Sequence, residues 1–471
     1  MKPESKPDLP AGAREQATEL PVFKSATELV SLLRARKIGA VELLYLHLER
    51  YEKYNRTINA VVAIDVDGAM QAARQADNDA RDSESLPPLH GLPMTIKDTY
   101  EVVGMPATCG FPFLAGHRPQ RDADAVVRLK SAGAIVYGKT NAPPGAFDWQ
   151  SYNPVYGTTN NPWDLTRTPG GSSGGSAASI AAGLAPLELG SDIGGSIRCP
   201  AHFCGIYGHK PSYGVVSLRG HIPPLPGQFM RYELGVGGPL ARSALDLELA
   251  MDVLAGPDSL DQSAVRIVIP PSRHERLPDF RVAVWADSDT FAVDSRCLAA
   301  IESYVQDLRG LGVRIDAKGR PKIDWHAAYE TYLATLLPVM GSGLPPQVVE
   351  RIIESAKSLS PGSTNYLART ARALSMRHFE YLSVMVQRER LRCSWQEFFQ
   401  DYDLLICPAM PVVAYAHDHR GEGAPDPITA CEARSMIVDG EPRIYFDGLQ
   451  WPSVATVADL PATAVPTPLW P

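Results

Sequence analysis

The chain has 471 residues, 45% of them hydrophobic and 21% charged, and a formal net charge of −8. This length and composition predict a globular protein with a large core. Acidic and basic residues are mixed along the chain without a basic face or polybasic segment, which argues against a nucleic-acid partner or an anionic lipid surface. No stretch approaches the ~18 consecutive apolar residues of a membrane span, so we expect no membrane association.

The cysteines and the N-terminal residues of the chain bear on its cellular compartment. Seven cysteines are scattered at positions 109, 199, 204, 297, 393, 407 and 431. An odd number without paired spacing is typical of a reducing compartment, and we expect a cytoplasmic protein. Residues 1–20 contain no apolar segment of signal-peptide length and are predicted to be a disordered tail before a domain that spans residues 21–471.

Local patterns predict alternating helices and strands. Ser25 and Glu28 have the spacing of a capping box and should open a helix that Gly39 interrupts, and a second helix follows to about Asn55. Further helices are expected at 68–82, 124–130 and 294–310, and strands at 59–64, 94–96, 134–137, 280–285 and 404–407. This order predicts an α/β fold, a single large domain with a central mixed, twisted β-sheet covered by helices on both faces.

Two segments read as additions to this scaffold. Residues 219–237 are too rich in proline for a helix or a central strand and should form a loop over a surface. The helical stretch at about 324–400 predicts either a cap beside the active site or a peripheral helical layer. We place the catalytic core at about 85–245.

A lysine and two serines are the candidate catalytic residues. Lys97 ends a short apolar strand, Ser172 lies in a glycine-rich run, and Ser196 follows two glycines. A serine hydroxyl is a weak nucleophile that needs a base, and no motif supplies a histidine for this role. Lysine can be that base only if its pKa falls from ~10.4, for which burial of the strand around Ile96 is suitable. Asp98 would oppose this fall, so its side chain should point elsewhere.

The order and spacing of these blocks resemble the amidase signature family of serine hydrolases. The matching segments are residues 91–98, 138–141, 161–164, 168–176, 192–198, 208–212 and 238–243. The resemblance implies that Ser196 is the acyl-accepting nucleophile, that Ser172 relays its proton and that Lys97 is the base. It also implies a cis peptide bond between Gly171 and Ser172. We expect a free-standing bacterial-type amidase, similar to aryl acylamidases and urethanases.

The loop around the nucleophile supplies the remaining parts. Successive backbone amides beside two glycines can converge on a developing negative charge, which predicts an oxyanion hole from Ile193, Gly194, Gly195 and Ser196. Asp192 and Arg198 flank the nucleophile and should form a buried pair that fixes the loop. Ser173 is expected to support the site by hydrogen bonding.

The substrate is a small molecule in this interpretation. Apolar and aromatic residues favour a hydrophobic or aryl amide, and esters and carbamates present the same trigonal carbonyl. The candidate pocket residues are Phe147, Tyr152, Phe229, Met230 and Leu337. No metal or organic cofactor is implied, and we expect a monomer or homodimer.

Other interpretations remain open. The family includes the glutaminase-type subunit of the amidotransferase that amidates misacylated tRNA, although residues 143–148 differ from that subunit's usual sequence. The run from Gly171 to Gly175 also matches the nucleophile elbow of α/β-hydrolases, which would make Ser173 the nucleophile of an esterase. Such an enzyme should have an aspartate and then a histidine downstream, and Asp418, which lies between two histidines in a polar, glycine-rich loop, is a poor setting for that triad. Cys199, His202, Cys204 and His209 match no common zinc spacing, and structural packing is favoured there.

Overall fold

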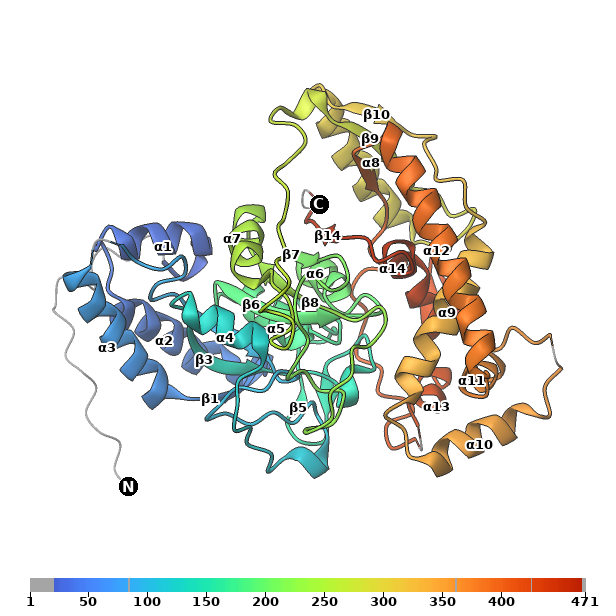
Figure 1. Cartoon of the computed structure of the whole chain (residues 1–471), viewed down its shortest axis with the longest axis horizontal. Helices are drawn as coiled ribbons and strands as arrows, with labels where there is room; N and C mark the ends of the chain where they lie inside the picture. Colours follow the sequence, from blue (N-terminus) through green and yellow to red (C-terminus); the bar gives the residue numbers. More distant parts are fainter. Residues whose placement is uncertain (1–20, 84, 361, 425, 468–471) are drawn as a thin grey trace.

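The site rests on a mixed β-sheet. The computed structural model describes residues 21–467 except 84, 361 and 425 (Figure 1), so the predicted tail 1–20 lies outside the described residues. Within them, seven strands are ordered β1-β3-β2-β6-β8-β7-β14. β2 pairs in parallel with β3 and β6, and the other neighbours are antiparallel. The strands are β1 (Val61–Ile64), β2 (Pro93–Lys97), β3 (Ile135–Thr140), β6 (Leu187–Asp192), β7 (Tyr207–Lys210), β8 (Val236–Ala241) and β14 (Ala462–Ala464).

Helices cover both faces of this sheet, as the sequence predicts. Alternation along β2 turns Thr95 and Lys97 to the same face, where Thr95 contacts Ser179 of α5 and Lys97 contacts Ser172 just before that helix, while Ile96 belongs to the main hydrophobic core. No helix in the described part of the chain is long and apolar enough to cross a bilayer. The helices of this half are α1 (Ala26–Arg34), α2 (Ala40–Ile58), α3 (Val66–Asp82), α4 (Asp124–Ser131), α5 (Gly174–Ala181), α6 (Arg198–Cys204) and α7 (Ala244–Leu254).

The C-terminal half builds a smaller sheet and a set of helices beside the central sheet (Figure 1). β9 (Arg281–Val284) lies between β10 (Arg314–Asp316) and β11 (Leu404–Ile406), all parallel. The predicted strands at 280–285 and 404–407 therefore exist but form a separate sheet. The helices here are α8 (Ser295–Gly310), α9 (Trp325–Gly341), α10 (Pro346–Ala356), α11 (Tyr366–Leu374), α12 (His378–Asp401), α13 (Pro427–Glu432) and α14 (Gln450–Thr456).

The two halves share a hydrophobic core and form one domain. A single buried cluster joins Trp149 and Phe203, from the first half, to Trp285, Tyr332 and Trp451. Short elements complete the fold: hairpins β4 (Tyr152–Asn153) with β5 (Gly157–Thr158) and β12 (Ser435–Val438) with β13 (Glu441–Ile444), and 3₁₀ turns η2 (Pro21–Phe23), η3 (Pro112–Leu114), η4 (Pro144–Ala146), η5 (Leu277–Asp279) and η6 (Tyr445–Leu449).

A carboxyl group is buried between the sheet and α5. Glu188 of β6 accepts hydrogen bonds from Thr140 (2.9 Å) and Ser176 (3.1 Å) and also from Thr95. Burial raises the pKa of Glu188 to about 8, against the lowering effect of these hydrogen bonds. At neutral pH the group is therefore largely a neutral acid that joins β2, β3, β6 and α5.

Replacing Glu188 by glutamine is expected to remove a pH dependence of stability. The unfolded carboxyl ionises near pH ~4.3, whereas the folded one keeps its proton to about pH 8. Because the folded chain then binds more protons, the wild type loses stability as pH rises between these values, by on the order of 5 kcal/mol. The free energy of unfolding of Glu188→Gln relative to wild type should rise over this window. Urea denaturation at several pH values measures it, and parallel pH profiles would contradict the prediction.

Candidate active site

Lys97 stands at the carboxyl end of β2 with its amine fully buried. Its Nζ lies 2.6 Å from Ser172 Oγ and 3.0 Å from Ser191 Oγ. Burial lowers the pKa of Lys97 to about 7, although Cys109, Asp192 and Glu188 act in the opposite direction. A substantial neutral fraction therefore exists near neutral pH, and the neutral amine can accept a proton from Ser172.

The neighbouring acid does not face this amine. Asp98 lies 3.4 Å from Lys139 Nζ and accepts hydrogen bonds from Thr108, as the sequence analysis anticipated. Lys139 also donates to the carbonyls of Tyr100 and Pro106. The acid thus pairs with a second buried lysine, and no carboxylate of the described residues contacts the Lys97 amine directly.

Tight glycine packing positions Ser172 ahead of α5. Gly170 has φ +88°, and a Cβ on Gly171 would lie 2.5 Å from the Asp148 carbonyl oxygen, so neither position accommodates a side chain. The Gly171–Ser172 peptide bond is cis, as the resemblance implies. Ser172 consequently presents its hydroxyl to Lys97 from a fixed backbone.

Ser173 has a different environment from Ser172. Its hydroxyl donates to the Ser191 carbonyl (3.2 Å) and accepts from the Ser191 amide (3.3 Å). His419, a neighbour of Asp418 in the alternative triad, stacks on Tyr152 with ring centroids 4.0 Å apart. The hydroxyl of Ser173 therefore joins the glycine-rich run to the end of β6, and no histidine among the described residues forms a hydrogen bond with it.

The loop after β6 carries Ser196 and several backbone amides. Gly195 has φ +97°, and a Cβ there would meet Pro452 at 2.9 Å. The inclusion of Gly195 among the oxyanion donors is wrong, because its amide already donates to Asp192 Oδ1 (2.9 Å). Within the described residues the amides of Ile193, Gly194 and Ser196 have no protein acceptor. These three amides are available to a developing oxyanion.

A buried ion pair fixes this loop. Arg198 donates to both carboxylate oxygens of Asp192, at 2.8 and 3.0 Å, and to the Pro452 carbonyl and Thr456 Oγ1 of α14 at 2.9 Å. Burial opposes ionisation of Asp192, but Arg198 and the Ile197 amide outweigh it and hold the pKa of Asp192 well below its usual value. The sequence analysis expected this pair, and the structure adds its link to the C-terminal half.

Two aromatic residues outside this loop donate hydrogen bonds to its carbonyl groups. Tyr332 of α9 donates to the Ile193 carbonyl (3.0 Å), and Trp149 Nε1 donates to the Gly194 carbonyl (2.9 Å). Because each carbonyl is held by an external donor, the orientations of the 193–194 and 194–195 peptides are set before any substrate arrives. Sequence reasoning missed both residues, since neither belongs to a motif that marks a contact with a loop.

Tyr332→Phe is expected to reduce kcat/KM by about 3- to 10-fold, which corresponds to the ~1 kcal/mol of one hydrogen bond. The loop would lose one of its external anchors while the ring still fills its place. Steady-state kinetics with a chromogenic amide measure the effect. Tyr137→Phe is the matched control, because Tyr137 donates to the Leu184 carbonyl away from the site. Equal kinetic losses in both variants would contradict a specific role for Tyr332.

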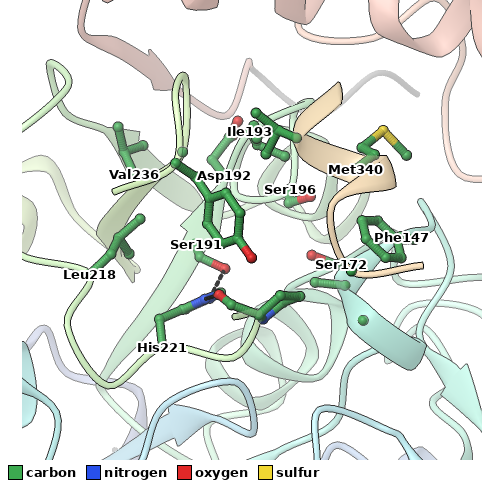
Figure 2. Close-up of a pocket in the computed structure, with 17 residues that line it drawn as sticks. Phe147, Ser172, Ser191, Asp192, Ile193, Ser196, Leu218, His221, Val236 and Met340 are labelled. Carbon is green, nitrogen blue, oxygen red and sulfur yellow. Dashed lines mark hydrogen bonds between the residues drawn. The ribbon is translucent and has the colours of Figure 1, made fainter. Parts of the chain in front are cut away.

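A cavity of about 610 Å³, including its open mouth, lies over these groups (Figure 2). Ser172 and Ser196 both open into it, and most of its other walls are apolar. The lining residues are Gly145, Ala146, Phe147, Ser172, Ser191, Asp192, Ile193, Ser196, Leu218, His221, Pro223, Tyr232, Gly235, Val236, Val339, Met340 and Gly343. The proline-rich loop and the end of α9 thus contribute directly to the cavity.

The predicted pocket residues can be compared with the lining of this cavity. Phe147 lines the cavity, but Leu337 does not. Leu337 is 1% exposed and packs in the hydrophobic core, while Val339 and Met340 at the end of α9 face the cavity. Helical periodicity identified an apolar helix here but not which turn meets the cavity.

The other three pocket predictions were wrong. Tyr152 is buried against the ring of His419. Phe229 and Met230 are 57% and 52% exposed, because they lie at the outer part of the loop, whereas Tyr232 returns to the cavity. Loop conformation decided these positions, and no local sequence signal encodes it.

The cysteine and histidine cluster noted in the sequence has ordinary contacts. His202 bonds with the Val412 carbonyl and His209 with Thr463 Oγ1. The described residues contain no group of three or more histidine, cysteine, aspartate or glutamate side chains arranged for a metal ion.

Comparison with known proteins identifies the family. A family model described as Amidase matches residues 42–467. A subunit of glutamyl-tRNA(Gln) amidotransferase from Acidothermus cellulolyticus is 32% identical over 428 residues, covering 86% of this chain and 83% of that protein. Among solved structures, an inhibitor-bound vestigial protein complex that reveals the evolutionary origins of an s-triazine catabolic enzyme matches with TM-score 0.75 and 28% identity. The match covers 93% of this chain and 90% of that chain. The corresponding amidotransferase subunit from Thermotoga maritima has TM-score 0.71 and 26% identity, covering 95% and 88%. The chain belongs to the amidase family.

Proposed function

We propose that this protein hydrolyses the amide bond of a hydrophobic or aryl substrate through an acyl-enzyme on Ser196. The observation that carries the proposal is the fully buried amine of Lys97, 2.6 Å from Ser172, beneath a cavity that Ser172 shares with Ser196. A buried neutral amine next to a serine pair suits proton transfer from a hydroxyl nucleophile.

The reaction begins with attack of Ser196 Oγ on the substrate carbonyl carbon. Its proton passes to Ser172 while the Ser172 proton passes to Lys97, which becomes an ammonium. The amides of Ile193, Gly194 and Ser196 bind the resulting oxyanion. Collapse breaks the carbon–nitrogen bond as the proton returns from Lys97 through Ser172 to the leaving amine. Water then attacks the acyl-enzyme, with the same groups moving its proton, and regenerates Ser196.

The cavity walls support an apolar substrate. Among the lining side chains in the described part of the chain, Asp192 is the one that carries charge, and Arg198 neutralises it. Val339 and Met340 of α9 line this space, which supports a role of the 324–400 segment as a cap. Aryl or alkyl groups fill such a cavity better than charged ones, and esters and carbamates share the carbonyl that the site would bind.

The experiment compares a p-nitroanilide, the matching p-nitrophenyl ester and an aryl carbamate. Wild type should turn over at least one of them, and Ser196→Ala and Lys97→Ala should lose that turnover. The relative rates then rank amide, ester and carbamate chemistry. Turnover that persists in Ser196→Ala would contradict the proposal.

A second candidate is the glutaminase-type subunit of a tRNA-dependent amidotransferase. The named curated relatives favour it, because they are subunits of such enzymes. Against it, glutamine carries an α-ammonium and an α-carboxylate, and the lining side chains offer no uncompensated charge to pair with them. Glutaminase activity together with partner subunits that co-elute in native purification would support this function over the first.

A further inference from the structure

A hydrogen-bonded chain extends from Lys97 through Ser191 to the proline-rich loop. Ser191 Oγ lies 3.0 Å from Lys97 Nζ and 2.9 Å from His221 Nε2 (dashed line in Figure 2). His221 Nδ1 lies 3.1 Å from the Pro223 carbonyl oxygen. The proposed reaction uses Ser172 and Ser196 and leaves Ser191 and His221 unassigned.

The chemistry of the groups fixes the direction of each hydrogen bond. A carbonyl oxygen only accepts, so Nδ1 of His221 carries the proton and donates to Pro223. Burial and the nearby charge of Lys97 lower the pKa of His221 to about 3, which keeps the imidazole neutral and leaves a lone pair on Nε2. Ser191 must therefore donate its hydroxyl proton to His221, and its oxygen accepts from Lys97.

This direction matters for the lysine. A neutral amine has two N–H groups and one lone pair, and it must offer the lone pair to Ser172 to act as a base. If the Ser191 hydroxyl were free to rotate, it could donate to the same lone pair and compete with Ser172. Because His221 takes the Ser191 proton, Lys97 directs an N–H to Ser191 and keeps its lone pair for Ser172.

We propose that His221 is a positioning residue that, through the Ser191 hydroxyl, reserves the lone pair of Lys97 for Ser172. The inference rests on the proposed function, since it assigns a role within the same proton path. Packing holds the imidazole in place. Its ring meets Tyr100 edge-on with centroids 4.9 Å apart, and its backbone amide donates to the Leu218 carbonyl at 2.9 Å.

Two substitutions at position 221 separate this role from loop structure. His221→Asn can keep a donor near the Nδ1 position for the Pro223 carbonyl but has no group at the Nε2 position. His221→Gln places an amide oxygen near that position and can accept from Ser191. We expect kcat to fall about 10-fold in His221→Asn, because the hydrogen bond that orients the Ser191 hydroxyl is lost. We expect His221→Gln to keep at least about a third of the wild-type kcat.

The decisive comparison removes the competing hydroxyl. In a Ser191→Ala background, His221→Asn should cause no further loss of kcat, because no hydroxyl remains to be oriented. His209→Asn is the matched control and should leave kcat unchanged, because His209 lies on β7 and contacts Thr463 of the edge strand β14. Thermal denaturation of each variant separates folding losses from kinetic ones.

Equal losses of kcat in His221→Asn and His221→Gln would overturn the inference. A further 10-fold loss of kcat when His221→Asn is added to the Ser191→Ala background would also overturn it. Failure of the proposed function has a different signature. In that case the wild type and Ser196→Ala would show the same turnover of the p-nitroanilide and ester, whatever stands at position 221.

Discussion

Lys97→Ala is expected to lower kcat/KM for the amide substrate by about 10²- to 10⁴-fold, the usual contribution of a general base. The substitution removes the amine that lies 2.6 Å from Ser172 and leaves no other base in contact with that hydroxyl among the described residues. In the wild type the rate should rise with pH through about 7, as Lys97 loses its proton. Initial rates of wild type and variant from pH 5 to 9 measure both effects.

Ser173→Ala is the informative comparison for Lys97→Ala. The Ser173 hydroxyl supports the end of β6 without contacting Lys97, so its removal should cost less activity. An active Lys97→Ala enzyme together with an inactive Ser173→Ala enzyme would instead indicate a nucleophile-elbow mechanism. A wild-type profile without an acid limb near pH 7 would contradict the role given to the lysine.

Arg198→Ala is expected to destabilise the fold by about 3–5 kcal/mol, because it leaves the carboxylate of Asp192 buried without its partner. It also removes the links to the Pro452 carbonyl and Thr456, so activity should fall with stability. The pKa of Asp192 lies below its usual value, so the pair stabilises the fold above about pH 4 and is lost only as pH falls further. Urea denaturation and steady-state kinetics at neutral pH measure the two losses.

Lys357→Ala provides the control for this ion pair. Lys357 and Glu354 form an exposed pair whose side chains are 67% and 71% exposed, and such pairs contribute less than about 1 kcal/mol. The buried and exposed variants should therefore differ by several-fold in their effect on the free energy of unfolding. A loss of less than about 1 kcal/mol in Arg198→Ala would contradict the structural role of the pair.

Local sequence patterns predicted most of the elements because their causes are local. The predicted capping box of Ser25 and Glu28 is formed at the start of α1, and helix α3 covers the predicted 68–82 segment. What local patterns do not contain is the partner of each strand. The predicted strand at 280–285 was correct as a strand, yet among the described strands it pairs with β10 and β11 and not with the central sheet, because sheet membership depends on long-range packing.

The candidate site also has features that local sequence predicts and features that depend on tertiary packing. Motif spacing brought Lys97, Ser172 and the Asp192–Arg198 pair into one prediction, and the structure places them together. The amide of Gly195 could not be predicted as occupied, because its acceptor depends on how the Asp192 side chain turns. The cavity walls were mostly missed, since they come from a proline-rich loop and the last turn of α9, where side-chain direction is set by tertiary packing.

The central claim is that Ser196 is the nucleophile and that Lys97 activates it through Ser172. The most direct measurement is peptide mapping by mass spectrometry after reaction with a fluorophosphonate, comparing wild type, Ser196→Ala and Lys97→Ala at neutral pH. A single adduct on Ser196, absent in Ser196→Ala and formed at least about 10²-fold more slowly in Lys97→Ala, is the predicted result. An adduct on Ser172 or Ser173, or undiminished labelling of Lys97→Ala, would contradict it.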